Sequence, residues 1–274
     1  MGPGATYLEA RGDSASRAKV LGCEIDRVDL EQALARCQAA IEARGFVQHM
    51  AINVAKLVAM RRDPKLRDGV AQCELVTADG QPVVWASRLL RDPLPERVAG
   101  IDLMERLLAL AAENGYRTYI LGARDEILQR AVERMRAEYP ALQLAGYRDG
   151  YYEDAEEAEV ARAITAARPD ILLVAMSSPR KEFFLARYRE RLGVPFVMGV
   201  GGAIDVYAGL RRRAPVWLQR LGLEWLFRLA QEPRRLARRY VTTNARFLAL
   251  LVRELLVQSR EEDARAGPGT SPLS

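Results

Sequence analysis

Residues 170–175 (DILLVA) and 195–200 (PFVMGV) carry the strongest indication of the fold in this sequence. Each is a short run with almost no polar position, which is typical of a strand that is buried on both of its faces. Small residues follow both runs, with Ser177 after the first and Gly201 after the second. Strands of this kind, separated by helical stretches, indicate a parallel sheet in an α/β protein.

The same alternation extends through the chain that precedes these runs. Asp29 is placed to cap a helix over residues 30–43, and Asn53 to open another helix after a strand at residues 46–52. Further strands are expected at residues 74–76, 117–121 and 142–145, and further helices at residues 101–113, 126–138 and 156–167. We therefore predict an α/β domain, a parallel sheet flanked by helices, over residues 20–213.

Outside this region the sequence changes character. From about residue 214 the strand-like runs stop and helical spacing continues to about residue 258, which predicts an all-helical C-terminal appendage. Residues 1–19 lack the apolar stretch of a signal peptide and are expected to form a flexible leader, and residues 259–274 a disordered tail. No window reaches the roughly 18 uninterrupted apolar residues that a membrane span needs.

The composition excludes several classes of protein. With 274 residues, 49% of them hydrophobic, the chain can bury a sizeable core. Its 20 Gly, 13 Pro and 3 Cys do not fit a collagen-like, disordered or disulfide-rich chain. Cys23, Cys37 and Cys73 form no CxxC pair, so we expect reduced thiols, no zinc site and a cytoplasmic location.

Positive charge is concentrated in the appendage. Ten arginines and two acidic residues lie between Arg211 and Arg246, which gives this segment a net charge of +8, whereas the rest of the chain sums to −3. A basic segment of this kind indicates an anionic partner.

Polar and small residues follow the predicted strands, at the edge where open parallel sheets bind their ligands. They are Asn53, Asp79, Gly80, Gly122, Ser177, Ser178, Lys181, Gly201, Gly202 and Asp205. Small residues let backbone N–H groups approach a phosphate, and the N-termini of the following helices favour anions. This pattern predicts a nucleotide or sugar-nucleotide ligand.

Other kinds of site are disfavoured. His49 is the only histidine, which disfavours His-dependent triads and His-rich metal sites. The glycines at positions 199, 201 and 202 do not complete a GxGxxG motif, because Asp205 stands nearest to the place of a third glycine. An NAD(P)-dependent oxidoreductase on a Rossmann fold and a basic nucleic-acid-binding protein remain as alternatives.

Five stretches resemble, in order, the WecG/TagA/CpsF glycosyltransferase family: 79–113 (DGQPVVWASRLLRDPLPERVAGIDLMERLLALAAE), 178–182 (SPRKE), 199–205 (GVGGAID), 213–225 (RAPVWLQRLGLEW) and 232–240 (EPRRLARRY). The likeness covers about residues 20–250. It implies a Rossmann-like fold and an inverting hexosyltransferase that needs neither metal nor cofactor. Such an enzyme moves N-acetylmannosamine, or a related sugar, from a UDP-sugar to a polyprenyl-diphosphate-linked saccharide. The family's setting implies a self-associating peripheral protein on the inner face of the cell membrane, acting in cell-surface polysaccharide synthesis and binding no nucleic acid.

The resemblance also implies roles for individual residues. Asp79 matches the family's general base, and a carboxylate at a strand end can take the proton of an attacking hydroxyl. Arg228, Arg235 and Arg238 match catalytic arginines of the appendage that would neutralise the charge of the departing UDP. The residues expected to bind substrate are Ala51, Asn53, Arg97, Ser178, Lys181, Gly201, Gly202 and Asp205.

Two of these positions depart from the family's pattern. Ala51 stands where the family usually has Thr, and Lys181 stands where it usually has Gln, in a Ser-Ser rather than a Gly-rich loop. A cation at residue 181 is able to contact the UDP diphosphate directly. Both departures bear on the choice of sugar.

The other basic residues of the appendage suggest a membrane surface. We expect anionic lipid head groups to contact Arg211, Arg212, Arg213, Arg234 and Arg239. Apolar side chains recur here at helical spacing, which fits either a stripe facing the core or an interfacial amphipathic helix. They are Trp217, Leu218, Leu221, Trp225, Leu226 and Leu229.

Overall fold

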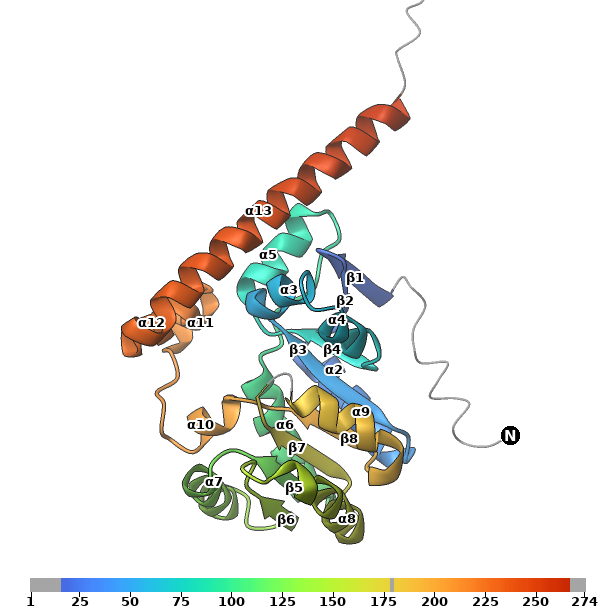
Figure 1. Cartoon of the computed structure of the whole chain (residues 1–274), viewed down its shortest axis with the longest axis vertical. Coiled ribbons are helices and arrows are strands. Elements are labelled where there is room, and N and C mark those ends of the chain that lie inside the picture. The colour runs from blue at the N-terminus through green and yellow to red at the C-terminus, as the bar shows by residue number, and fades with distance from the viewer. Residues whose placement is uncertain (1–15, 178–179, 267–274) are drawn as a thin grey trace, which may run out of the picture.

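A six-stranded parallel sheet forms the centre of the protein (Figure 1). The computed structural model describes residues 16–177 and 180–266. The sheet has the strand order β4-β3-β8-β7-β5-β6, and every neighbouring pair is parallel. Its strands are β3 (Val47–Ile52), β4 (Leu75–Ala78), β5 (Arg117–Gly122), β6 (Gln143–Arg148), β7 (Ile171–Ala175) and β8 (Phe196–Gly199). The predicted α/β fold class is confirmed.

The two apolar runs form β7 and β8, which lie side by side in the middle of the sheet. Ile171 pairs with Phe196 and Leu173 with Met198, and all of β7 is buried. Each of these strands has a neighbour on both edges and helices on both faces, which explains their lack of polar residues. The edge strand β6 is only half-buried along most of its length.

A hairpin that the sequence did not indicate packs beside β4. It consists of β1 (Arg17–Val20) and β2 (Cys23–Asp26), which are antiparallel. The buried Asp26 carboxylate accepts the backbone N–H of Val76 at 2.7 Å and forms an ion pair with Arg36 at 2.8 Å. A backbone donor of the edge strand β4 is thereby satisfied without a further strand. β1 begins inside the stretch expected to be a leader.

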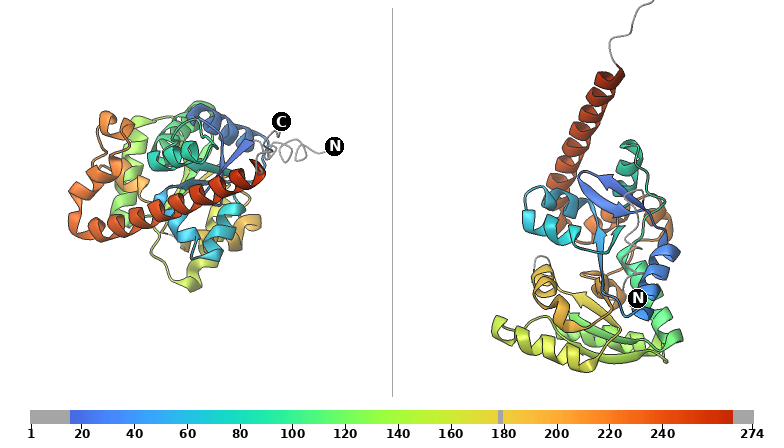
Figure 2. Two further views of the ribbon diagram at one scale, coloured as in Figure 1. Left: turned by 90° about the horizontal axis from the view of Figure 1, so that it is seen from above. Right: turned by 90° about the vertical axis from the view of Figure 1, so that its right-hand side faces the viewer.

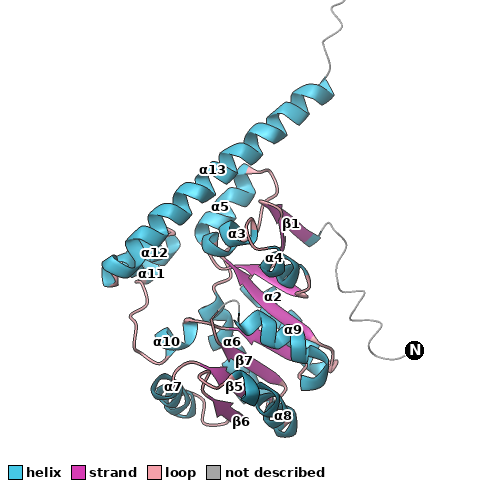
Figure 3. Cartoon of the chain, in the orientation of Figure 1, coloured by secondary structure: helices cyan, strands magenta, loops and turns pink. Residues whose placement is uncertain are grey.

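Helices cover both faces of the sheet (Figure 3). One face carries α2 (Leu30–Glu42), α6 (Gly100–Asn114), α7 (Asp125–Glu138) and α10 (Ala203–Tyr207). The other carries α3 (Val54–Met60), α4 (Pro64–Ala71), α5 (Gln81–Leu89), α8 (Glu157–Ala167) and α9 (Arg180–Leu192). Asp29 and Asn53 cap α2 and α3, as their positions predicted: each accepts a backbone N–H, at 2.7 and 3.1 Å.

The C-terminal region is helical, with α11 (Val216–Arg220), α12 (Glu224–Gln231) and the long α13 (Pro233–Ala266). α13 packs against α3 and buries Phe247 and Leu251 in the core. Its 34 residues span about 50 Å, so the helix projects beyond the body of the molecule (Figure 2). Within residues 16–177 and 180–266, none of the helices has the length and apolar character to cross a membrane.

Candidate active site

Asp79 lies where β4 ends, and the surrounding backbone fixes its position. Its N–H donates to the carbonyl of Ile52 at 2.8 Å, which ties the end of β4 to the end of β3. Its Oδ1 accepts the N–H of Gly100 at 3.0 Å, at the first residue of α6. The carboxyl group is therefore held at a helix N-terminus, in an orientation set by two secondary-structure elements.

The surroundings of Asp79 change its acidity. Burial raises the pKa of this carboxyl, while the Gly100 N–H and the guanidinium groups of Arg228 and Arg97 oppose the rise; the net effect is a pKa above the usual value. A carboxylate with a raised pKa is a stronger base, so this group is better suited to accept a proton near neutral pH than an ordinary aspartate.

A polar cavity of about 400 Å³ opens on Asp79 at the carboxyl ends of four strands. Its walls come from β3 and β4, from the segment after β7 and from the loop after β8. Among the side chains that the structure describes, five cationic ones line it: Lys56, Lys181, Arg212, Arg213 and Arg228. Ala51, Asn53, Gly201 and Gly202, all expected to bind substrate, also line it. Residues far apart in the sequence thus meet at the carboxyl ends of the strands.

Lys181 is buried beneath the glycine loop that follows β8. Its side chain is 5% exposed and its Nζ lies 3.3 Å from the Glu182 carboxylate. A Cβ at residue 199 would lie 2.8 Å from this Nζ, so the glycine at residue 199 leaves room for the lysine side chain in this position. Lys181 therefore provides a fixed positive charge in the wall of the polar cavity.

Lys56 is a second cation in this wall, and sequence reasoning missed it. Its Nζ donates to the carbonyl of Ala51 at 2.8 Å and lies 3.0 Å from the sulfur of Met50. Burial, reinforced by the charge of Lys181, lowers the pKa of Lys56 to about 8, against the opposing effect of Glu182 and Asp79. The only signal in the sequence is its place one turn after Asn53, on a helix that starts at a strand end.

An apolar cavity of about 430 Å³ lies on the other side of Asp79. It is bounded by α3, α5, α12 and α13, and most of its wall consists of aliphatic and aromatic side chains. Four residues line both cavities: Asn53, Asp79, Glu224 and Arg228. The carboxyl group of Asp79 thus stands at the junction of a cationic and an apolar compartment.

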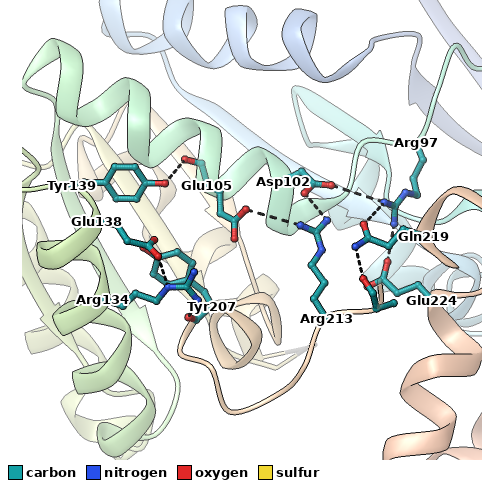
Figure 4. Close-up of polar contacts among 11 residues, drawn as sticks. Arg97, Asp102, Glu105, Arg134, Glu138, Tyr139, Tyr207, Arg213, Gln219 and Glu224 are labelled. Atoms are coloured by element: carbon teal, nitrogen blue, oxygen red, sulfur yellow. Dashed lines mark hydrogen bonds and ion pairs between the residues drawn. The ribbon is translucent and has the colours of Figure 1, made fainter. Parts of the chain in front are cut away.

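Ion pairs attach the C-terminal helices to the α/β body (Figure 4). Glu224 of α12 lies 2.8 Å from Arg97 and 2.8 Å from Arg228, and Gln219 of α11 accepts from Arg97 at 3.3 Å. Burial raises the pKa of Glu224, but Arg228 and Arg97 outweigh it and hold that pKa below its usual value. This carboxylate is therefore charged at neutral pH and positions two arginines beside Asp79.

Three of the arginines expected at lipid head groups, Arg211, Arg212 and Arg213, contact acidic side chains or line the polar cavity. Arg213 forms ion pairs with Asp102 at 2.5 Å and with Glu105 at 4.0 Å (Figure 4), and it lines the polar cavity. Arg211 lies 3.7 Å from Asp205 and 3.4 Å from Glu232. Arg213 is therefore held against α6 of the α/β body, while the side chain of Arg211 stays 41% exposed. Their contact with lipid head groups stays a prediction.

The remaining expected site residues do not line the polar cavity or lie outside the described part of the chain. Arg97 lines the apolar cavity rather than the polar one, and Asp205 takes part in the ion pair with Arg211. Arg238 is exposed on α13. The side chain of Arg235 and the whole of Ser178 lie outside the described residues.

His49 has a structural position. It is buried in β3, and its Nε2 lies 2.9 Å from the hydroxyl of Thr77. Burial, with the nearby charges of Lys56 and Lys181, lowers the pKa of His49 to about 3, so the ring is neutral at physiological pH. Among the described residues, no three His, Cys, Asp or Glu side chains are grouped to hold a metal ion.

Comparison with known proteins gives concordant matches. The model of the Glycosyl transferase WecG/TagA/CpsF family matches residues 18–261. An N-acetylglucosaminyldiphosphoundecaprenol N-acetyl-beta-D-mannosaminyltransferase of Bacillus spizizenii (strain W23) is 36% identical over 186 residues, 66% of this chain and 72% of the relative. A protein with the same description from Bacillus subtilis (strain 168) is 35% identical over 182 residues, 66% of this chain and 70% of the relative. The chain belongs to the WecG/TagA/CpsF family of glycosyl transferases.

Proposed function

We propose that the chain transfers N-acetylmannosamine from a UDP-sugar to N-acetylglucosamine carried on a polyprenyl diphosphate. The observation that carries the proposal is the place of Asp79 between a cationic and an apolar cavity. Two such compartments beside one base suit a transferase with a nucleotide donor and a lipid-linked acceptor. The names of the two relatives specify the same pair of sugars, which favours a transferase over an oxidoreductase or a nucleic-acid-binding protein.

The polar cavity suits the UDP-sugar. Gly201 and Gly202 leave the backbone open to close approach by a diphosphate, and Lys181 supplies a fixed charge beneath that loop. Arg228 approaches from the appendage and lines the same cavity. We assign these groups to the diphosphate, and Asn53, whose Oδ1 already caps α3, to a hydrogen bond from its amide NH₂ to the sugar.

In the proposed reaction Asp79 acts as the general base. The acceptor hydroxyl attacks the anomeric carbon of the donor as its proton passes to the Asp79 carboxylate. A bond forms between that oxygen and the anomeric carbon while the bond from this carbon to the UDP oxygen breaks. Displacement from the opposite face inverts the anomeric configuration. UDP leaves with the bonding electrons, and its charge is met by Arg228 and Lys181.

The proposal assigns this neutralisation to side chains, with no metal ion and no cofactor. Its support is the gathering of five cationic residues around one cavity. Excess EDTA is expected to leave the transfer rate unchanged. A strong inhibition that added Mg²⁺ reverses would contradict this part of the proposal.

We also propose that the protein works at the inner face of the cell membrane, in cell-surface polysaccharide synthesis. The support is a set of exposed large apolar side chains: Trp217 of α11, Leu221 in the turn that follows it and Leu226 of α12. They adjoin a segment rich in arginine, a combination that favours an interfacial position on an anionic bilayer.

A donor screen tests the sugar assignment. A prenyl-diphosphate-linked N-acetylglucosamine is incubated with UDP-N-acetylmannosamine, UDP-N-acetylglucosamine, UDP-glucose or UDP-galactose, and the lipid product is identified by its mass. Transfer from UDP-N-acetylmannosamine is expected to exceed the others by at least about tenfold. Preferential transfer of another sugar would refute the donor, and the absence of transfer from every donor would refute the function.

A further inference from the structure

The apolar cavity has dimensions and chemistry of its own. Its volume of about 430 Å³ lies within the usual range of small-molecule sites, roughly 300–1,000 Å³. Six large apolar side chains dominate its wall: Trp85 and Leu89 of α5, Trp225 of α12, and Phe247, Leu248 and Leu251 of α13. Charged groups enter the wall mainly at one end, where Asp79, Glu224 and Arg228 lie. Such a site orients an elongated ligand that is polar at one end only.

The turn between α11 and α12 packs tightly against α5 in the wall of the apolar cavity. Gly222, in the turn between α11 and α12, has a φ of +67°, and a Cβ there would lie 2.8 Å from the Trp85 ring and 2.9 Å from Gln81. Only glycine permits this approach of the turn to α5. The appendage is thus fitted against α5 at the point where the cavity begins.

Several apolar residues of the cavity wall remain in contact with solvent. Trp85 is 44% exposed, Leu89 57% and Leu248 58%. Leu248 is followed on α13 by Val252 and Leu256, four residues apart each time and also exposed, so an apolar row leads out of the cavity along one side of the helix. A contiguous apolar surface of this kind marks a binding site for an apolar partner.

We infer that this cavity binds the isoprene units of the acceptor that adjoin its diphosphate, an assignment that rests on the proposed function. The acceptor's sugar hydroxyl must reach Asp79, and the apolar cavity begins at Asp79. The diphosphate would then lie near Arg228 and Arg97, which both line the cavity. The rest of the polyprenyl chain would leave along the row of Leu248, Val252 and Leu256 toward the bilayer.

A binding measurement without membranes tests this inference. Trp85 and Trp225 line the cavity, so their fluorescence reports its occupation when farnesyl diphosphate or inorganic diphosphate is titrated into the full-length protein. Farnesyl diphosphate is expected to bind at least about tenfold more tightly, because the prenyl chain leaves water on binding. Equal affinity for the two probes would overturn the inference.

Matched variants on one helix locate the binding. Leu248→Gln is expected to weaken farnesyl diphosphate binding about tenfold, since it removes apolar contact from the wall. Val241→Gln is the control, because Val241 is 68% exposed on the same helix and is not part of the cavity wall. Equal losses in the two variants would overturn the inference.

A kinetic experiment distinguishes a failure of this inference from a failure of the proposed function. Two acceptors carry the same sugar diphosphate, one esterified with a farnesyl group and the other with a methyl group. In the wild type and in Val241→Gln the farnesyl acceptor is expected to have a kcat/KM about a hundredfold higher, and in Leu248→Gln this ratio falls to about tenfold. An unchanged ratio in Leu248→Gln would overturn the cavity assignment. Failure of the wild type to transfer sugar to either acceptor would instead refute the proposed function.

Discussion

Three structural features determine what Asp79 can do. Its backbone joins the ends of β4 and β3, its Oδ1 accepts from Gly100, and its carboxyl lines both cavities. The first two features fix the orientation of the Asp79 carboxyl, and the third gives this carboxyl access to two ligands. A group fixed in this way loses little entropy when the reacting atoms come together.

The raised pKa of Asp79 has a consequence for the pH dependence of the reaction. The carboxyl must be ionised to act as a base, so kcat/KM should fall as the pH decreases through its pKa, which burial places above the usual value for Asp. We expect the acidic limb of the profile at a higher pH than for an exposed aspartate. Initial rates measured from pH 4 to pH 8 check this, and activity that stays constant down to pH 4 would contradict it.

Lys56 gives a second pH effect, on the binding of anions. Its pKa of about 8 in the free protein should rise when a diphosphate binds nearby, so binding takes up a proton above pH 8. The Kd for UDP is therefore expected to increase with pH above 8, by up to about tenfold per unit. Titration calorimetry between pH 7 and pH 9 measures this dependence of the Kd on pH.

Two variants control this pH experiment. Lys56→Gln should remove the pH dependence, whereas Lys65→Gln, at an exposed position on α4, should retain it. The same slope in Lys56→Gln as in the wild type would show that another group takes up the proton.

Some site residues could be predicted from the sequence because their position depends only on local pattern. Asp79, Asn53 and Lys181 follow strands, and the carboxyl ends of parallel strands share one edge. Glu224 could not be predicted in this way. Its role depends on Arg97, which is 127 residues earlier in the chain, and no periodicity reports a contact across that separation.

Among the secondary-structure elements, the apolar inner strands were predictable, while several short elements were not. The inner strands β7 and β8 and the helix α2 lie within two residues of their expected bounds, and α3 begins directly after its expected cap, Asn53. α5 was missed because Gly80 and Pro82 look like a turn, although proline is well tolerated in the first turn of a helix. The hairpin of β1 and β2 was missed because its four-residue strands are too short to show alternation.

The attachment of α11 and α12 depends on Glu224. Arg97 is only 14% exposed, so Glu224→Gln leaves a largely buried guanidinium with a weaker partner, and we expect the attachment to lose about 1–3 kcal/mol. Hydrogen exchange should accelerate in α11 and α12 while β7 and β8 stay protected. Glu190→Gln, at an exposed position on α9, is the control. Unchanged exchange in Glu224→Gln would contradict this role.

At the scale of the whole molecule, the arginines of residues 211–246 have several different roles. Arg211 and Arg213 pair with acidic groups of the α/β body, and Arg228 lines the polar cavity. The net charge of +8 in residues 211–246 therefore overstates the charge that faces solvent. The exposed apolar residues of α11 and α12 become correspondingly more important for membrane binding.

Membrane binding should depend on those apolar residues. Trp217→Ser is expected to weaken binding to vesicles with 30% anionic lipid about tenfold, because the indole leaves the interface. Tyr151→Ser is the matched control, since Tyr151 is a 71% exposed aromatic residue that follows β6, the edge strand opposite β4. Sedimentation with vesicles measures both. Equal effects of the two substitutions would contradict an orientation with the appendage on the bilayer.

One measurement tests the central claim most directly. Wild type and Asp79→Asn, matched for thermal unfolding, are incubated with UDP-N-acetylmannosamine and a prenyl-diphosphate-linked N-acetylglucosamine, and the disaccharide lipid is quantified by mass spectrometry. The amide can still accept from Gly100 but cannot take a proton, so we expect the wild type to form the product and the variant to do so about 10²–10⁴ times more slowly. No product from the wild type, or equal rates for the two proteins, would contradict the account.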